Sequence, residues 1–172
     1  MNSGKVFEGD FKASVPSDFY MLRLKDPAVA FSGGMSKFAP NNPYDYLLFK
    51  ENAYCIELKT SEGAITFWSE KFAGDGKKRT YEIKEHQIKS LEKAAMHEKV
   101  YAGLLLNFRK HGRTIYVPIH KFLEFVASTD KKSINCDDAI SYGFEVESKL
   151  LKVHYRYNIN KMCEEAVKFG KQ

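Results

Sequence analysis

The chain has 172 residues, of which 44% are hydrophobic and 14% aromatic, and its formal net charge is +5 at pH 7. This length and composition suit one globular domain, residues 1–172, with a substantial core. No hydrophobic run approaches the roughly 18 residues that span a bilayer, which excludes a transmembrane protein. Three irregularly spaced cysteines exclude a disulfide framework or a zinc site, and the N-terminus lacks the apolar stretch of a signal peptide. We therefore expect a cytoplasmic protein with reduced thiols.

The first elements along the chain are a helix and a strand. Hydrophobic residues recur at a spacing of four within residues 4–15, which predicts one stripe of an amphipathic helix. The segment 19–24 (FYMLRL) has the composition of a strand. Residues 26–42 are rich in Gly, Ser, Pro and Asn and show no clear period. Because so long a loop is uncommon in a compact domain, we expect this segment to have a function.

The stretch NPYDYLLFKENAYCIELKT, residues 42–60, predicts a β-hairpin that contains two acidic residues. A three-residue polar turn at 50–52 would place Asp45 directly opposite Glu57 on one face of the hairpin. A turn one residue shorter would put the two carboxylates on opposite faces, so their meeting depends on this register.

The remainder of the chain alternates strands and helices. With the elements before it, this order predicts a mixed α/β sheet sandwiched by helices. The predicted elements are a strand at 64–68, a basic loop at 74–79, a helix at 83–98, strands at 100–108 and 114–118, helices at 119–126 and 136–142, a strand at 150–155 and a helix at 160–169.

Two carboxylates that face one another among apolar neighbours repel each other and lose hydration. A divalent cation would compensate for both effects, and carboxylate oxygens are hard ligands that suit Mg²⁺ or Mn²⁺. Lys59 follows Glu57 by two residues on the same face, where its ammonium could orient a water or hold a phosphate oxygen. The alternative is that Asp45 ends a strand in water and Glu57 simply pairs with Lys59.

Two other polar residues lie on or beside apolar stripes of predicted helices. Glu8 lies beside the stripe of the first helix, and Gln87 lies on the stripe of the helix at 83–98. A glutamine on an apolar stripe should have a buried hydrogen-bond partner. For each of the two, the alternative is an edge residue that reaches solvent.

Several of these segments resemble the RecU-type Holliday junction resolvases of the PD-(D/E)xK nuclease superfamily. An E-x-K pattern alone is common, whereas E-x-K followed by an EHQI helix is fairly specific to that family. The resemblance spans most of residues 4–135. It is carried by GKVFEGDF at 4–11, the YDYLL…YCIELKT hairpin, TFW at 66–68, EHQIKSL at 85–91, GLLLNF…IYVPI at 103–119 and KKSI at 131–134.

The resemblance implies a restriction-endonuclease-like α/β fold, a mixed β-sheet flanked by helices, in which residues 26–42 form a stalk that projects between the first two strands. It also implies Mg²⁺-dependent cleavage of four-way DNA junctions by paired symmetric nicks during recombination and repair. The implied enzyme is a homodimer, with branch-migration or recombinase proteins as further partners. A bacterial and a phage-encoded member both fit.

The resemblance also assigns roles by position. Asp45 and Glu57 would bind the metal, and Glu8 would complete the acidic cluster. Lys59 would activate the attacking water, and Gln87 would support the site from its helix. These roles fit phosphodiester cleavage, which needs an in-line water, a Lewis acid on the phosphoryl oxygen and neutralisation of developing charge.

Basic residues cluster in three loops and in the proposed stalk, and the net charge favours acidic partners such as nucleic acid. Each cluster could follow DNA phosphates or could be an ordinary solvated loop. Two other functions stay open: a nuclease for other branched or duplex DNA, and a non-catalytic nucleic-acid-binding or recombination-regulating module on a nuclease fold. The predicted DNA contacts are Lys37, Lys77, Lys78, Arg79, Arg109, Lys110, Arg113, Lys131 and Lys132.

Overall fold

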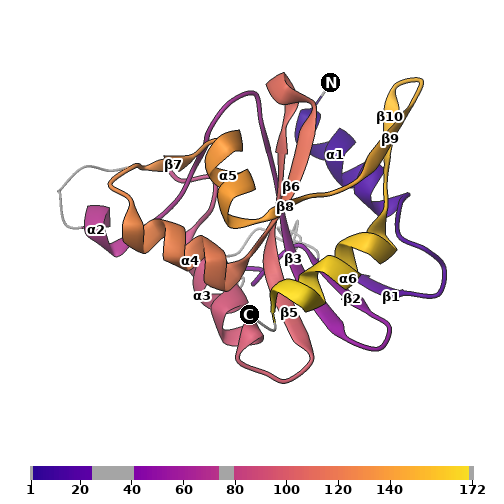
Figure 1. Cartoon of the computed structure of the whole chain (residues 1–172), viewed down its shortest axis with the longest axis horizontal. Helices are drawn as coiled ribbons and strands as arrows, with labels where there is room; N and C mark the ends of the chain where they lie inside the picture. The colour runs from indigo at the N-terminus through magenta and orange to yellow at the C-terminus, as the bar shows by residue number, and fades with distance from the viewer. Residues whose placement is uncertain (1, 25–40, 74–79, 171–172) are drawn as a thin grey trace, which may run out of the picture.

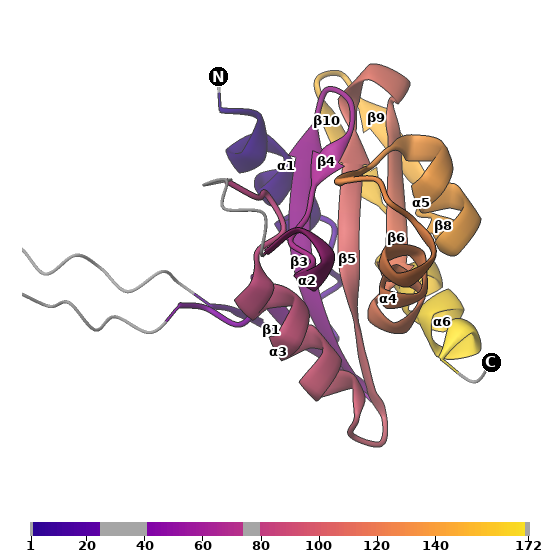
Figure 2. The same ribbon diagram turned by 90° about the vertical axis from the view of Figure 1, so that its left-hand side faces the viewer.

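The computed structural model of the protein describes residues 2–24, 41–73 and 80–170. Its centre is a six-stranded sheet that is seen edge on in Figure 1 and face on in Figure 2. In spatial order the strands are β1 (Tyr20–Arg23), β2 (Tyr46–Phe49), β3 (Ala53–Ser61), β5 (Val100–Phe108), β6 (Arg113–Pro118) and β8 (Phe144–Glu145).

The sheet is mixed, because β3 and β5 run parallel while the other neighbouring strands run antiparallel. Helices cover both of its faces (Figure 1). One layer contains α1 (Ser3–Lys12) and α6 (Ile159–Phe169), and the other contains α3 (Glu85–Ala95), α4 (Ile119–Ser128) and α5 (Cys136–Tyr142). The predicted α/β class, a mixed sheet flanked by helices, is confirmed.

Short elements complete the described chain, and none of its helices has the length and apolar character needed to cross a membrane. Two pairs of short strands lie outside the main sheet. The short elements are β4 (Ile65–Thr66) paired with β7 (Ser133–Ile134), β9 (Ser148–Leu151) paired with β10 (His154–Tyr157), helix α2 (Glu70–Ala73) and the 3₁₀ helix η1 (Arg109–His111).

Strand β3 divides the core into two apolar clusters. Its successive side chains point to opposite faces, and helices cover both faces, so five consecutive residues of the strand are buried. Tyr54 and Ile56 pack in the cluster beneath α1 and α6, whereas Cys55 packs in the cluster beneath α3, α4 and α5. Glu57 shares the face of Cys55, and a carboxylate therefore lies inside an apolar layer.

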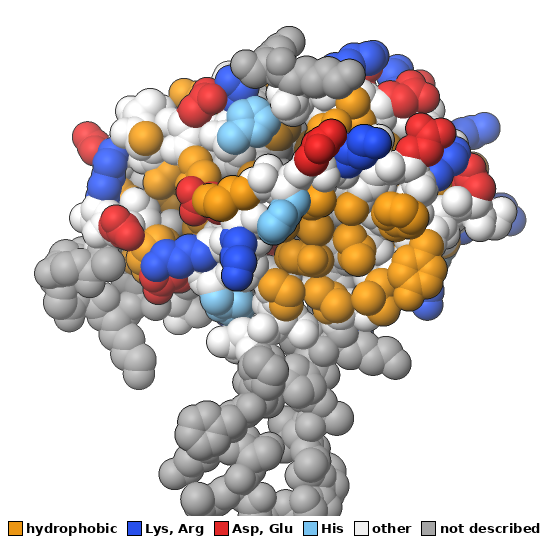
Figure 3. Space-filling model, turned by 90° about the horizontal axis from the view of Figure 1, so that it is seen from below, with side chains coloured by type: hydrophobic (Ala, Val, Ile, Leu, Met, Phe, Trp, Pro, Cys, Tyr) orange, Lys and Arg blue, Asp and Glu red, His pale blue; other side chains and the backbone are white. Residues whose placement is uncertain are grey.

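The helices leave the β1 edge of the sheet open. Tyr20 and Phe49 lie directly opposite each other on β1 and β2 and are 62% and 51% exposed. Figure 3 shows hydrophobic side chains gathered on one side of the molecule when it is seen from below. Strand β2, which directly follows Asp45, therefore lies between the open edge strand β1 and the buried β3.

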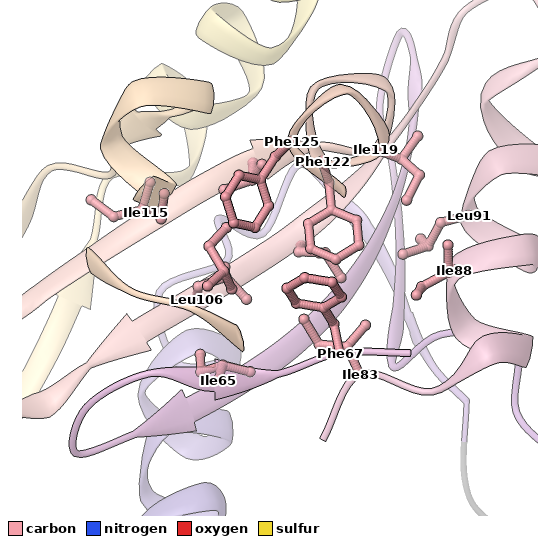
Figure 4. Close-up of a cluster of buried hydrophobic side chains, with 14 of the residues drawn as sticks. Ile65, Phe67, Ile83, Ile88, Leu91, Leu106, Ile115, Ile119, Phe122 and Phe125 are labelled. Atoms are coloured by element: carbon pink, nitrogen blue, oxygen red, sulfur yellow. The ribbon is translucent and has the colours of Figure 1, made fainter. Parts of the chain in front are cut away.

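The cluster beneath α3, α4 and α5 is centred on aromatic rings (Figure 4). The ring of Phe67 is fully buried and meets Phe122 and Phe125 edge-on, with centroids 5.5 and 5.7 Å away. Phe67→Ala is expected to lower the free energy of unfolding by about 3–5 kcal/mol, because it leaves a cavity. The matched control Phe49→Ala, at a half-exposed site, should cost below about 1 kcal/mol in the same chemical denaturation. Equal losses would contradict this assignment of the core.

One predicted element is wrong, and the predicted stalk and the basic loop at 74–79 lie largely or wholly outside the described residues. The segment predicted as a single strand at 150–155 is instead the β9–β10 hairpin, whose turn includes Lys152 with a φ of 55°. A left-handed backbone at a lysine is uncommon, so side-chain alternation gave no sign of the turn. The proposed stalk connects β1 to β2 in sequence, but residues 25–40 of it are not among those described.

Candidate active site

The β2–β3 hairpin brings Asp45 to Glu57. Its register pairs Leu47 with Cys55, as the sequence predicted, and this register is confirmed. Asp45 directly precedes β2, and its main-chain N–H donates to the carbonyl of Ile56 at 3.2 Å. Its carboxylate Oδ2 accepts from the main-chain N–H of Leu58 at 2.8 Å. These two bonds hold the Asp45 carboxylate against the middle of β3.

The Glu57 side chain is buried, with an exposed fraction of 1%, and only one of its oxygens is hydrogen-bonded. Oε1 accepts from Lys59 Nζ at 2.6 Å and from Gln87 Nε2. Oε2 has no hydrogen-bond partner within the described part of the chain. An unpaired buried carboxylate oxygen is costly, so this atom requires a proton or a cation.

Gln87 links the sheet to helix α3. It lies in the first turn of that helix, where its Oε1 accepts from the main-chain N–H of Lys84 at 2.9 Å. The other end of the amide donates to Glu57. The prediction that Gln87 has a buried partner is confirmed, and the partner is the carboxylate of the E-x-K pattern.

The electrostatics of the pair favour added positive charge. Burial raises the pKa of Glu57 to about 7, with Asp45 adding to the rise and Lys59 opposing it. Burial likewise raises the pKa of Asp45, against the hydrogen bond from Leu58 and the charge of Lys59. Burial therefore destabilises the ionised form of each carboxylate. A bound cation would stabilise the ionised form of both.

Glu8 lies on α1, on the opposite side of β3 from Gln87. Its carboxylate accepts from Tyr46 Oη at 3.0 Å and is paired with the guanidinium of Arg23. Burial raises the pKa of Glu8, but the hydrogen bonds from Arg23 and Tyr46 outweigh burial and lower it. The charge of Glu8 in turn raises the pKa of Asp45.

The structure thus brings Asp45, Glu57, Lys59 and Gln87 together and gives Glu8 a separate partner. Among residues 2–24, 41–73 and 80–170, no set of three or more His, Cys, Asp or Glu side chains is grouped so as to hold a metal ion. Sequence reasoning missed Arg23, the one charged residue in the FYMLRL strand. An isolated arginine in such a strand was the signal that could have identified it.

Four of the predicted DNA contacts lie outside the described residues, and five lie within them. Lys37, Lys77, Lys78 and Arg79 lie outside the described residues. Lys132 Nζ lies 5.0 Å from the ring centroid of Phe72, and Lys110 lies in η1 beyond the end of β5. The other three have carboxylate partners: Arg109 with Glu62 at 3.2 Å, Arg113 with Glu145 at 3.0 Å and Lys131 with Asp138 at 2.7 Å.

Comparison with known proteins finds a relative by sequence and a more distant similarity among solved structures. No protein-family model matches the chain. Among solved structures, it is similar to Hjc of Archaeoglobus fulgidus, a Holliday junction resolvase from an archaeal hyperthermophile. That similarity has a TM-score of 0.42 and 16% identity, and it covers 74% of this chain and 83% of Hjc.

Sequence similarity is stronger and nearly complete in length. The chain is 31% identical over 188 residues to the SPbeta prophage-derived uncharacterized protein YotM of Bacillus subtilis (strain 168). The alignment covers 97% of this chain and 88% of YotM. The chain therefore belongs to the same protein family as YotM.

Proposed function

We propose that the protein is a Mg²⁺-dependent, structure-selective DNA endonuclease that resolves Holliday junctions. The observation that carries the proposal is the Oε2 atom of Glu57, a buried carboxylate oxygen without a hydrogen-bond partner in the described chain. It lies beside Asp45, in a site that also contains Lys59 and Gln87. Two carboxylates, a lysine and a glutamine in this order match the residues by which the chain resembles RecU-type resolvases.

The proposed metal ligands are Asp45 and Glu57, because carboxylate oxygens suit Mg²⁺ and also Mn²⁺, which should substitute. When bound, the ion would act as a Lewis acid on the phosphoryl oxygen. Glu8 is the third carboxylate of the proposal. Its charge already acts on Asp45, and in the described structure Arg23 neutralises it.

Lys59 and Gln87 would prepare the site for reaction. The side chain of Lys59 is 20% exposed, so its ammonium can meet a water or a phosphate oxygen while it contacts Glu57. Gln87 holds Oε1 of Glu57 and leaves Oε2 for the cation. Lys59 would orient the attacking water and favour loss of its proton, whereas Gln87 acts only by positioning Glu57.

The four-way junction as substrate rests on the resemblance of residues 4–135 to RecU-type resolvases. A homodimer with two-fold symmetry would match a symmetric junction and would place two sites for paired nicks. Residues 26–42 would enter the junction centre. A cytoplasmic enzyme of recombination and repair, with a branch-migration or recombinase protein as partner, is the corresponding cellular role. A phage-encoded origin is in keeping with the prophage origin in YotM's name.

Cleavage of synthetic DNA tests this proposal. The protein should introduce paired symmetric nicks into a labelled four-way junction in Mg²⁺, and EDTA should abolish them. Y-shaped and linear duplexes should stay intact under the same conditions. Equal cutting of all three would favour a less selective nuclease, and junction binding without cutting would favour a non-catalytic module.

A further inference from the structure

The β9–β10 hairpin is an exposed ribbon that lies beside α1 at the right of Figure 1. Every residue of β9 and of the turn is exposed, and Val153 at the turn is 75% exposed. Residues 148–157 (SKLLKVHYRY) contain no Asp or Glu. Their basic side chains are Lys149, Lys152, His154 and Arg156.

Three of the four basic side chains of this hairpin have no carboxylate partner within the described residues, and the fourth, His154, contacts Asp10. Lys149 lies directly opposite Arg156, and like charges at opposed positions destabilise a strand pair. In the described part of the chain, no ion pair joins Lys149, Lys152 or Arg156 to a carboxylate; Arg156 Nη1 donates to the carbonyl of Tyr155 at 2.9 Å. The contrast with the carboxylate-paired Arg109, Arg113 and Lys131 is direct.

The hairpin is nevertheless held firmly in place. The buried carboxylate of Asp10, on α1, accepts from the main-chain N–H of Tyr155 at 2.9 Å and contacts His154 Nδ1 at 2.7 Å. Ser14 Oγ accepts from the main-chain N–H of Tyr157 at 2.9 Å. Asp10 and Glu8 both lie on α1, so the helix that holds the hairpin also carries the third carboxylate of the proposed site.

A groove between α1 and β10 extends this basic surface. Lys5 and the buried Asp10 of α1 line it together with His154 and Arg156. The surface therefore combines side chains from both elements, and its position is set by the bonds to Asp10. Such a fixed row of cations suits a polyanion, because little ordering is needed on binding.

We infer that the β9–β10 hairpin is a DNA-binding arm that holds a duplex leading to the candidate active site. A two-stranded β-ribbon fits the major groove of DNA, and lysines and arginines on it can contact the phosphates. The exposed side chains of Leu151, on the same face as Lys149 and Arg156, and of Val153 at the turn would meet the sugars and the groove floor. This inference rests on the proposed function, because it assigns a second contact surface for the same DNA substrate.

Charge removal on the hairpin tests the inference. Binding of a labelled four-way junction and a labelled duplex is measured by fluorescence anisotropy in EDTA over a range of salt concentrations. Lys149→Ala/Lys152→Ala should weaken binding of both DNAs about tenfold and make the slope of log K against log salt shallower by about 2. The control Lys121→Ala/Lys168→Ala removes the same charge from α4 and α6 and should bind within about twofold of the unmodified protein.

The conservative variant Lys149→Arg/Lys152→Arg should restore binding, which separates loss of charge from loss of fold. If Lys149→Ala/Lys152→Ala binds DNA as tightly as the control Lys121→Ala/Lys168→Ala, the inference is overturned. Junction cleavage by the unmodified protein in Mg²⁺ is measured separately. Binding through the hairpin without any cleavage would support the inference and contradict the proposed nuclease. If Lys149→Ala/Lys152→Ala keeps its DNA affinity but loses binding to phosphatidylserine vesicles, the inference is overturned in favour of a hairpin that binds a membrane surface.

Discussion

Asp45→Asn and Glu57→Gln are each expected to lower the rate of junction cleavage in Mg²⁺ by about a thousandfold or more. Each change removes a formal charge from the proposed cation site while keeping an oxygen. That oxygen can still accept from Leu58 at position 45, or from Lys59 and Gln87 at position 57. The fold should therefore survive, and initial rates on a labelled junction measure the loss.

Junction binding in EDTA should be unchanged in these variants, or slightly tighter, because a negative charge that repels phosphate is gone. Glu62→Gln is the matched control, since Glu62 directly follows β3, pairs with Arg109 and is 72% exposed. Its cleavage rate should stay near that of the unmodified protein. Near-normal turnover of either site variant would show that the proposed metal ligands are wrongly assigned.

The meeting of Asp45 and Glu57 could be predicted because it depends only on local rules. Side-chain alternation and a three-residue turn determine which residues of a hairpin face one another, and the observed register agrees. The identity of the hydrogen-bond partner of Gln87 could not be predicted in this way. A buried partner followed from the apolar stripe, but its identity depends on how α3 packs on β3, 30 positions away in sequence.

Pairing between distant segments accounts for what sequence reasoning missed. Arg113 was predicted as a DNA contact from its loop alone, and the structure adds that β8 pairs with β6 and brings Glu145 to it. Glu8 was predicted to complete an acidic cluster, and the packing of α1 also brings Arg23 and Tyr46 to its carboxylate. In both cases the residue type was informative about charge, whereas its neighbours were decided by tertiary packing.

The metal-free protein should lose stability as the pH rises from about 4.5 to about 7. In this window the folded state keeps Glu57 protonated, because its pKa is about 7, whereas the unfolded chain ionises it near 4.5. The folded state therefore binds more protons, and the free energy of unfolding falls with rising pH. The contribution of Glu57 is fully present below 4.5 and lost above 7, and 2.5 pKa units correspond to about 3 kcal/mol.

Other groups titrate nearby, so the effect must be read as a difference between variants. Burial lowers the pKa of His86 and His120, which makes stability rise with pH in part of the same window and opposes the effect of Glu57. Chemical denaturation in EDTA of the unmodified protein and of Glu57→Gln at pH 5 and pH 8 removes the contribution of the histidines, because the variant keeps both, and leaves that of Glu57 with its coupling to Asp45. The unmodified protein should become less stable relative to the variant by about 3 kcal/mol over this range.

Mg²⁺ should reverse this loss at pH 8, since a cation that binds only the folded protein stabilises it by an amount that grows with the logarithm of its concentration relative to its Kd. At pH 5 a proton already occupies Glu57, so the same concentration of Mg²⁺ should raise the melting temperature much less. Glu57→Gln should show little response to Mg²⁺ at either pH. If Mg²⁺ does not change the melting temperature of the unmodified protein at pH 8, the carboxylate pair is not a metal site. The buried oxygen of Glu57 would then be satisfied by a proton.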